Sequence, residues 1–184
     1  LVHHARDQHR QPRGLGQAVE GQAEALAVPV APGFPVTIYI DGQDGHTGSY
    51  SLQHVLTPFT EVEPNDSRPQ ANTYIDPFTA SIFPAYDADW IRVTVNTAGT
   101  DIVAEIQDVG DGGCVKKAID SQIEILGPDG VTSLAFNDDL SASVYCSKAT
   151  ALNVPPGIYY IKAGASVQYA PSLTFIYKLK VTLQ

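Results

Sequence analysis

The stretch of the chain richest in metal-binding chemistry is Glu61-Val62-Glu63-Pro64-Asn65-Asp66, in which four of six side chains carry oxygen. Ca²⁺ prefers about six to eight oxygen ligands, drawn from carboxylates, amide carbonyls and water. Because side chains alternate between the two faces of an extended segment, Glu61, Glu63 and Asn65 are expected to point to the same side. The spacing therefore indicates half of a calcium site. The competing interpretation is a solvated turn, since Asn and Asp after a proline are also common turn and cap residues.

Composition and charge narrow the class of protein. The 184 residues carry a formal net charge of −9, and the 11 Lys and Arg form no basic stripe, so we expect no nucleic-acid partner. No run approaches the roughly 18 apolar residues of a membrane span. The sequence contains no Met. We therefore expect that a leader has been removed or that the chain is a fragment of a longer protein.

The first 57 residues differ in character from the rest. Residues 1–30 hold three of the five His and no β-branched alternation, which predicts a poorly structured or weakly helical segment. Residues 31–57 contain two alternating runs around a Gly-rich loop, which predicts a β-hairpin. A lone hairpin is marginally stable at best, so this one must pack against other parts of the protein.

Residues 58–184 carry the pattern of an all-β domain. Short runs rich in Val, Ile and Thr are separated by turn signals such as Gly127-Pro128-Asp129-Gly130. About eight short strands of this kind fit an antiparallel β-sandwich. The predicted strands are residues 79–83, 90–96, 102–107, 122–126, 131–136, 149–154, 159–163 and 175–183.

Cys114 and Cys146 are the only two cysteines, and their separation is not that of a CxxC motif. In an exported protein they would pair, whereas in a cytosolic protein they would be two buried thiols. We favour the disulfide. Closing a loop of this length stabilises a fold by about 3 to 4 kcal/mol in the chain-entropy model.

Five motifs in order along residues 58–184 resemble the bacterial pre-peptidase C-terminal (PPC) domain. The resemblance implies a jelly-roll-like antiparallel β-sandwich in a secreted bacterial protein, related to the collagen-binding modules of clostridial collagenases. Residues 33–52 are similar to the last hairpin of a preceding copy. The five motifs are Glu61-x-Glu63-Pro64-Asn65-Asp66-Ser67, Asp87-Ala88-Asp89-Trp90, Asn137-Asp138-Asp139, Pro156-Gly157-x-Tyr159-Tyr160 and Tyr177-x-Leu179-x-Val181.

The resemblance also implies a calcium site between the acidic segment and the loop before the Asp-aromatic strand. One position departs from the family pattern, because Tyr86 stands where the calcium-binding relatives usually have Asp. Either Asp87 or the backbone carbonyl of Tyr86 replaces that ligand, or the second of two metals is lost. The acidic turn Asn137-Asp138-Asp139 is a further metal candidate, with a hairpin turn as its alternative. Carried over by position, the implied ligands are Glu61, Glu63, Asn65, Asp66, Ser81 and Asp89.

Both the residues and the resemblance favour a non-catalytic protein. The sequence contains no GxSxG or HExxH motif, and every His lies at or before position 54, outside the predicted domain. A small hydrolase that uses Asp87 and Asp89 as an acid pair is a minor alternative. Collagen binding is not implied, because Gly164 and Ser166 stand where the collagen-binding relatives present tyrosines.

We therefore expect a calcium-stabilised accessory module of a secreted or cell-surface protein, serving in targeting, surface binding or maturation. Its expected partner is a catalytic domain of the same parent protein, such as a peptidase, or an extracellular protein or polysaccharide. The alternative is a structural spacer in a tandem adhesive array. Neighbouring sequence separates the two, because an upstream peptidase favours the first and further copies favour the second.

Overall fold

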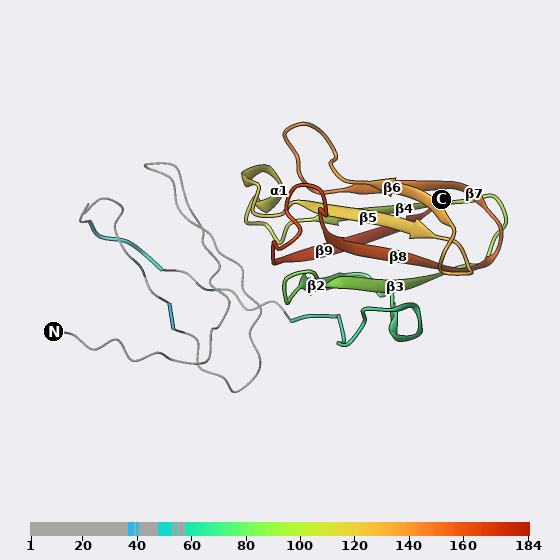
Figure 1. Cartoon of the computed structure of the whole chain (residues 1–184), viewed down its shortest axis with the longest axis horizontal. Helices are drawn as coiled ribbons and strands as arrows, with labels where there is room; N and C mark the ends of the chain where they lie inside the picture. Colours follow the sequence, from blue (N-terminus) through green and yellow to red (C-terminus); the bar gives the residue numbers. More distant parts are fainter. Residues whose placement is uncertain (1–36, 39, 41–47, 53, 55–57) are drawn as a thin grey trace.

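The computed structural model describes residues 37, 38, 40, 48–52, 54 and 58–184 (Figure 1). The segment predicted for 1–30 and most of the hairpin predicted for 31–57 lie outside these residues, and both stay predictions. The described elements are η2 (Arg68–Gln70), β1 (Asn72–Thr73), β2 (Phe78–Ile82), β3 (Ala88–Val95), β4 (Thr100–Gln107), α1 (Gly113–Lys116), β5 (Ser121–Leu126), β6 (Ser133–Asn137), β7 (Lys148–Val154), β8 (Gly157–Ala165) and β9 (Phe175–Leu183).

Two sheets pack face to face as a β-sandwich, which confirms the predicted fold class (Figure 1). One sheet has the order β1-β3-β8-β5-β6 and the other the order β2-β9-β4-β7. All neighbouring strands are antiparallel except β1 and β3. Each of the eight predicted strands is present, with ends within two residues of the prediction.

The core lies between the sheets, and strand alternation builds it. In β3, Ile91, Val93 and Val95 are buried while Arg92 and Thr94 are exposed. Because successive side chains of a strand face opposite sides, one such strand supplies a row of inward apolar groups. Burying each Val or Ile side chain stabilises the fold by roughly 1.5 to 3 kcal/mol. This row also fixes the direction in which the polar residues at the start of β3 must point.

Strand β8 is buried on both faces at its two adjacent tyrosines. Tyr159 lies in the core at 1% exposure, and its hydroxyl donates to the Pro155 carbonyl at 2.7 Å. Tyr160 faces the other way, outside the core, under the Arg68 guanidinium and against the Trp90 ring. Strand β8 therefore places one tyrosine in the core and its neighbour on the rim.

The disulfide predicted between Cys114 and Cys146 is present, with their Cα atoms 5.0 Å apart. It joins α1 to the residue pair that precedes β7. The Tyr145 amide also donates to the Cys114 carbonyl at 2.9 Å. The connection from β4 to β5 and the connection from β6 to β7 are therefore held together both covalently and by hydrogen bonding. No helix within the described residues is long and apolar enough to cross a membrane.

Residues 58–77, which we call the linker segment, run beside β2 and β3, and most of them are exposed (Figure 1). Asn65 is the one buried residue among them, while Val62 and Ile75 are 69% and 61% exposed. Backbone hydrogen bonds from Thr60 to Thr79 and from Trp90 to Asn65 attach the segment to the sheets. Hydrogen bonds, together with the Tyr74 ring that packs against the core, therefore fix the linker segment.

Arg68 is one attachment in the middle of the linker segment. Its Nη1 and Nη2 atoms donate to the carbonyls of Asp129 and Pro128 at 2.7 and 3.0 Å, and its guanidinium lies 5.3 Å from the Tyr160 ring centroid. Gly130 leaves room for it, since a Cβ atom there would lie 2.5 Å from the Arg68 Cδ. Arg68 thereby joins the linker segment to the β5–β6 turn.

Candidate metal centre

The linker segment brings Glu61 and Glu63 against Asp89, near the start of β3. One ligand oxygen from each of these three side chains lies within 4.8 Å of the others. Two oxygens on opposite sides of an ion that binds them at about 2.4 Å lie about 4.8 Å apart. The three carboxylates therefore fit within one coordination sphere. We call Glu61, Glu63, Asn65 and Asp89 the linker site.

Asp89 is the buried member of the linker site. It occupies an inward position of β3 and is 0% exposed. Its Oδ2 atom accepts a hydrogen bond from the Tyr177 hydroxyl at 2.6 Å, whereas no donor from the described residues reaches its buried Oδ1 atom. Burying a carboxylate is costly unless it is paired or binds a metal. Asp89 has one partner, from the opposite sheet, and one free oxygen.

Asn65 is completely buried and organises the two glutamates. Its backbone amide donates to Glu63 Oε2 at 2.8 Å, and its Nδ2 atom donates to Glu61 Oε1 at 3.2 Å. Its Oδ1 atom is buried without a donor among the described residues. Buried polar atoms are nearly always satisfied, so the free oxygens of Asn65 and Asp89 are candidate ligands for a cation.

The pKa values around the linker site show repulsion between its carboxylates. Burial raises the pKa of Asp89 well above its ordinary value, and the Glu61 charge raises it further. The pKa of Glu63 is raised by burial and then by Glu61. Burial and the Asp89 charge also raise the pKa of Tyr177. The charges that raise these pKa values are carboxylates, so a divalent cation would relieve the repulsion among them.

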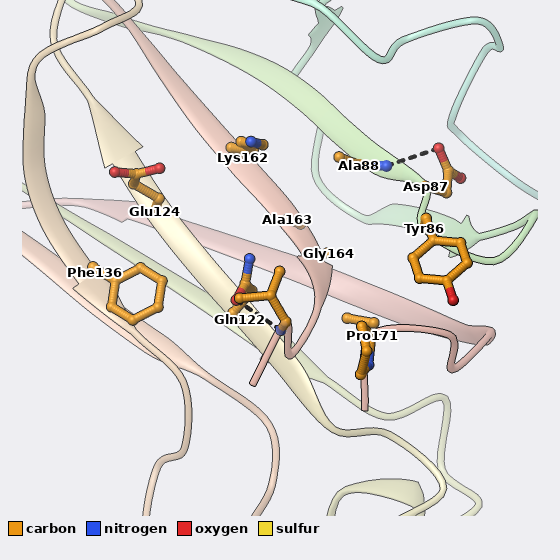
Figure 2. Close-up of a pocket in the computed structure, with 12 residues that line it drawn as sticks. Tyr86, Asp87, Ala88, Gln122, Glu124, Phe136, Lys162, Ala163, Gly164 and Pro171 are labelled. Atoms are coloured by element: carbon orange, nitrogen blue, oxygen red, sulfur yellow. Dashed lines mark hydrogen bonds between the residues drawn. The ribbon is translucent and has the colours of Figure 1, made fainter. Parts of the chain in front are cut away.

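Asp87 stands at the edge of the site and shapes the loop before β3. Its Oδ2 atom accepts a hydrogen bond from the Phe83 amide at 2.8 Å, and its Oδ1 atom accepts one from the Ala88 amide at 2.8 Å, which Figure 2 shows. Burial raises the pKa of Asp87 to about 6, and contact with the Asp66 side chain contributes to the rise. Asp66 and Asp87 thus form a second acidic pair beside the linker site.

The structure places the implied ligands differently, and Asp66 lies beside Asp87 and outside the linker site. It brings Glu61, Glu63, Asn65 and Asp89 together. Ser81 holds Glu61 in place, because its amide donates to Glu61 Oε2 at 2.9 Å. The Tyr86 side chain is 74% exposed, at a φ of 72°, and takes no part in the cluster. Sequence reasoning missed Tyr177, whose inward position on β9 was visible in the alternation but whose contact with Asp89 was not.

The residues of the acidic turn after β6 also differ in their hydrogen-bond partners. The Asn137 side-chain oxygen accepts a hydrogen bond from the Lys148 amide at 2.9 Å, so it links β6 to β7. Asp138 and Asp139 have buried Oδ1 atoms that no donor from the described residues reaches. They lie close to Asp120, a residue that the sequence analysis did not single out.

A shallow groove of about 190 Å³ lies on the outer face of the β3-β8-β5-β6 sheet, next to Asp87. In Figure 2, Phe136 and Tyr86 lie on opposite sides of it, with Glu124 and Lys162 between them along one edge. Phe136 is 57% exposed. The groove therefore has two aromatic ends that the sequence analysis did not place together.

A scan against models of protein families finds none that matches this chain, and a search of curated proteins finds no match. A similar solved structure is that of PliG from Aeromonas hydrophila, a periplasmic lysozyme inhibitor of g-type lysozyme. It is 14% identical, and the alignment covers 59% of this chain and 89% of that chain with a TM-score of 0.40. The class of the protein therefore rests on its own structure, a disulfide-bonded β-sandwich with a cluster of three carboxylates, of which Asp89 is buried.

Proposed function

We propose that residues 58–184 form a non-catalytic, calcium-stabilised accessory module of a secreted or cell-surface protein, of the PPC-like kind that the motifs resemble. The observation that carries the proposal is the linker site. Its three carboxylates and its two free buried oxygens lie where a segment with one buried residue meets the sandwich. A bound ion would join Glu61 and Glu63 of the linker segment to Asp89 of the sheet.

Calcium is the metal that the donor set favours. The ligand atoms are carboxylate and amide oxygens, without thiol or imidazole, which is the preference of a hard cation. Mg²⁺ demands near-ideal octahedral geometry, whereas Ca²⁺ accepts irregular sites with bidentate carboxylates. Extracellular modules bind Ca²⁺ with dissociation constants of about 10⁻⁴ to 10⁻³ M, which matches an ion used outside the cell.

An extracytoplasmic location is supported by the Cys114–Cys146 disulfide, because disulfides persist in oxidising compartments. In such a location, calcium would keep the linker segment fixed to the sandwich. The module would then hold a defined orientation to whatever precedes it in the parent protein. This is the property that a targeting appendage of a catalytic domain requires, and a spacer in a tandem array would use it equally.

The test is calorimetry of the protein in calcium and in EDTA. We expect calcium to raise the melting temperature, because a ligand that binds only the folded state stabilises it by mass action. Glu63→Gln should remove most of that rise. Glu124→Gln is the matched control, since it removes one carboxylate from the outer face of β5 and should leave the rise intact. Identical transitions with and without calcium would show that the linker site binds no ion.

The accessory role has a separate test. The reading frame that encodes the chain should contain a catalytic domain, such as a peptidase, next to this module. Further copies of the sandwich in place of a catalytic domain would favour the spacer instead. Either outcome leaves the calcium site itself unaffected.

A further inference from the structure

The groove on the outer face of the β3-β8-β5-β6 sheet, which we call the outer groove, lies over two neighbouring rows of cross-strand pairs. Because directly paired residues of antiparallel strands point to the same face, each row is continuous across the sheet. The first row has an aromatic ring at each end and consists of Trp90, Lys162, Glu124 and Phe136. The second row consists of Ala88, Gly164 and Gln122.

Gly164 makes the second row a trough. It occupies an outward position of the central strand β8, between Ala88 of β3 and Gln122 of β5. Its backbone does not lie in the left-handed region, and a Cβ atom there would approach only the Asp87 carbonyl oxygen, at 3.6 Å. The backbone would therefore accept a larger residue at this position. The absence of a side chain is what keeps the outer groove open.

Two exposed aromatic rings stand on opposite sides of the trough (Figure 2). The Phe136 side chain is 57% exposed and the Tyr86 side chain is 74% exposed. Tyr86 also has a φ of 72°, a backbone conformation that a bulky residue rarely adopts. Residues held in such conformations gather at binding sites, where the strain sets the position of a side chain. The two rings therefore form the walls of a small concave site.

The polar side chains of the outer groove have unused hydrogen-bonding capacity. Lys162 and Glu124 are directly paired on β8 and β5, but neither takes part in an ion pair among the described residues. Gln122 uses its Oε1 atom to accept a hydrogen bond from the Val167 amide at 3.2 Å, which leaves its Nε2 group as a donor. The outer groove thus offers an ammonium and an amide as donors and a carboxylate as an acceptor.

We propose that the outer groove binds a neutral polysaccharide, with one pyranose unit held in the trough between Phe136 and Tyr86. The faces of a pyranose ring carry C–H groups that pack on the negative face of an aromatic ring, and its rim carries hydroxyls that both donate and accept. Charge favours an uncharged ligand, because Lys162 and Glu124 balance each other and both Asp87 oxygens already accept hydrogen bonds from backbone amides. Concave sites with apolar walls and a few polar groups are typical of ligand binding.

An extended peptide fits the outer groove less well. Peptides commonly bind to a sheet by adding a strand to a free edge. The outer groove lies over β8 and β5, which are internal strands with neighbours on both sides. Its contacts must therefore come from side chains, and a polysaccharide supplies the matching hydroxyls itself. The proposal deepens the accessory role proposed above, but the outer groove shares no side chain with the linker site.

Sedimentation of the full chain with insoluble polysaccharides tests the proposal. The probes are cellulose, chitin and a β-1,3-glucan, with gelatin-coated beads as the protein alternative. We expect saturable retention on at least one of the three polysaccharides, and retention should persist in about 0.5 M NaCl because the ligand carries no charge. Retention on none of the polysaccharides, or on gelatin alone, would overturn the proposal. Failure of the calcium test would leave this result unaffected, so the two proposals can fail separately.

Variants locate the binding in the outer groove. Gly164→Leu should abolish retention by filling the trough. Phe136→Ala should weaken binding about tenfold, and Phe136→Trp should restore it, because the ring and not the phenylalanine itself is needed. Leu152→Ala is the control, since it removes a 70% exposed apolar side chain from β7 in the other sheet. Retention of Gly164→Leu equal to that of the wild type would contradict the proposal, even if Phe136→Ala did not fold.

Discussion

The linker site and the aspartates Asp120, Asp138 and Asp139 place carboxylates in different mechanical settings. In both, aspartate or asparagine oxygens are buried without donors, and carboxylates raise the pKa values of their neighbours. Asp120, Asp138 and Asp139 lie in a part of the molecule that a disulfide and Lys117 already hold. The linker site joins the sandwich to a segment in which Asn65 alone is buried.

This difference teaches where an ion matters most for stability. Where covalent and apolar contacts already fix a segment, an added cation mainly neutralises charge. Where they are absent, the same cation supplies the attachment itself. We therefore expect calcium to control the position of the linker segment, and the disulfide to control the stability of the β4–β5 and β6–β7 connections.

The largest effect is expected from removing the disulfide, which is the covalent element of this comparison. Replacing both cysteines, Cys114→Ala with Cys146→Ala, should lower the free energy of unfolding by about 3 to 4 kcal/mol, since the unfolded chain regains the entropy of an open loop. Denaturant titration measures the loss. Calcium affinity at the linker site should be unchanged. A large fall in that affinity would mean that the two regions are not independent.

The next largest effect is expected from replacing Asp89, the buried carboxylate of the linker site. Asp89→Asn should abolish the stabilisation by calcium, which amounts to about 2.7 kcal/mol when the ion is at 100 times its dissociation constant. In EDTA at neutral pH the same variant should be more stable than the wild type, because it removes a buried charge that faces Glu61. Thermal unfolding in both conditions measures this change of sign. A variant that is less stable in both would indicate a purely structural role for Asp89.

Arg68 sharpens the comparison, because it attaches the linker segment without metal. Arg68→Ala removes two hydrogen bonds to backbone carbonyls and the contact with Tyr160, and should cost about 1 to 2 kcal/mol. Because the contact involves no ion, the cost should be equal in calcium and in EDTA. Denaturant titration in the two buffers checks it. A cost that appears only in EDTA would show that calcium makes Arg68 redundant.

The smallest effect is a pH dependence of the metal-free protein. The pKa of Asp87 is raised from 3.8 to about 6 in the folded state, so between these values the folded chain binds more protons than the unfolded chain. Stability from this group is therefore present at low pH and is lost as the pH rises from about 4 to 6. Asp87→Asn should flatten that slope in EDTA, as measured by thermal unfolding across this range. An unchanged slope would assign it to other groups.

Much of the fold was predictable because strands leave a period of two in the sequence. Ile91, Val93 and Val95 show that period, and β3 was placed within two residues of its observed ends. Strand β1 was missed because it has two residues and pairs in parallel through the position of the linker segment. A two-residue parallel pairing leaves no recognisable alternation in the local sequence.

The candidate site was predictable only in part, for the same reason. Glu61, Glu63 and Asn65 are close in sequence, so an extended backbone alone brings them together. The contact of Tyr177 with Asp89 spans 88 residues and crosses between the sheets, so no spacing indicates it. Asp120 was missed because the β5–β6 hairpin separates it in sequence from its acidic neighbours Asp138 and Asp139.

Hydrogen exchange of the backbone amides tests most directly whether calcium attaches the linker segment to the sandwich. The amides of Asn65 and Trp90, which bond within the site, should exchange more slowly in calcium than in EDTA. Core amides, such as that of Ile161 in β8, should exchange at the same rate in both. Equal exchange of Asn65 and Trp90 in the two conditions would contradict the account, because it would mean that the linker segment is held without the ion.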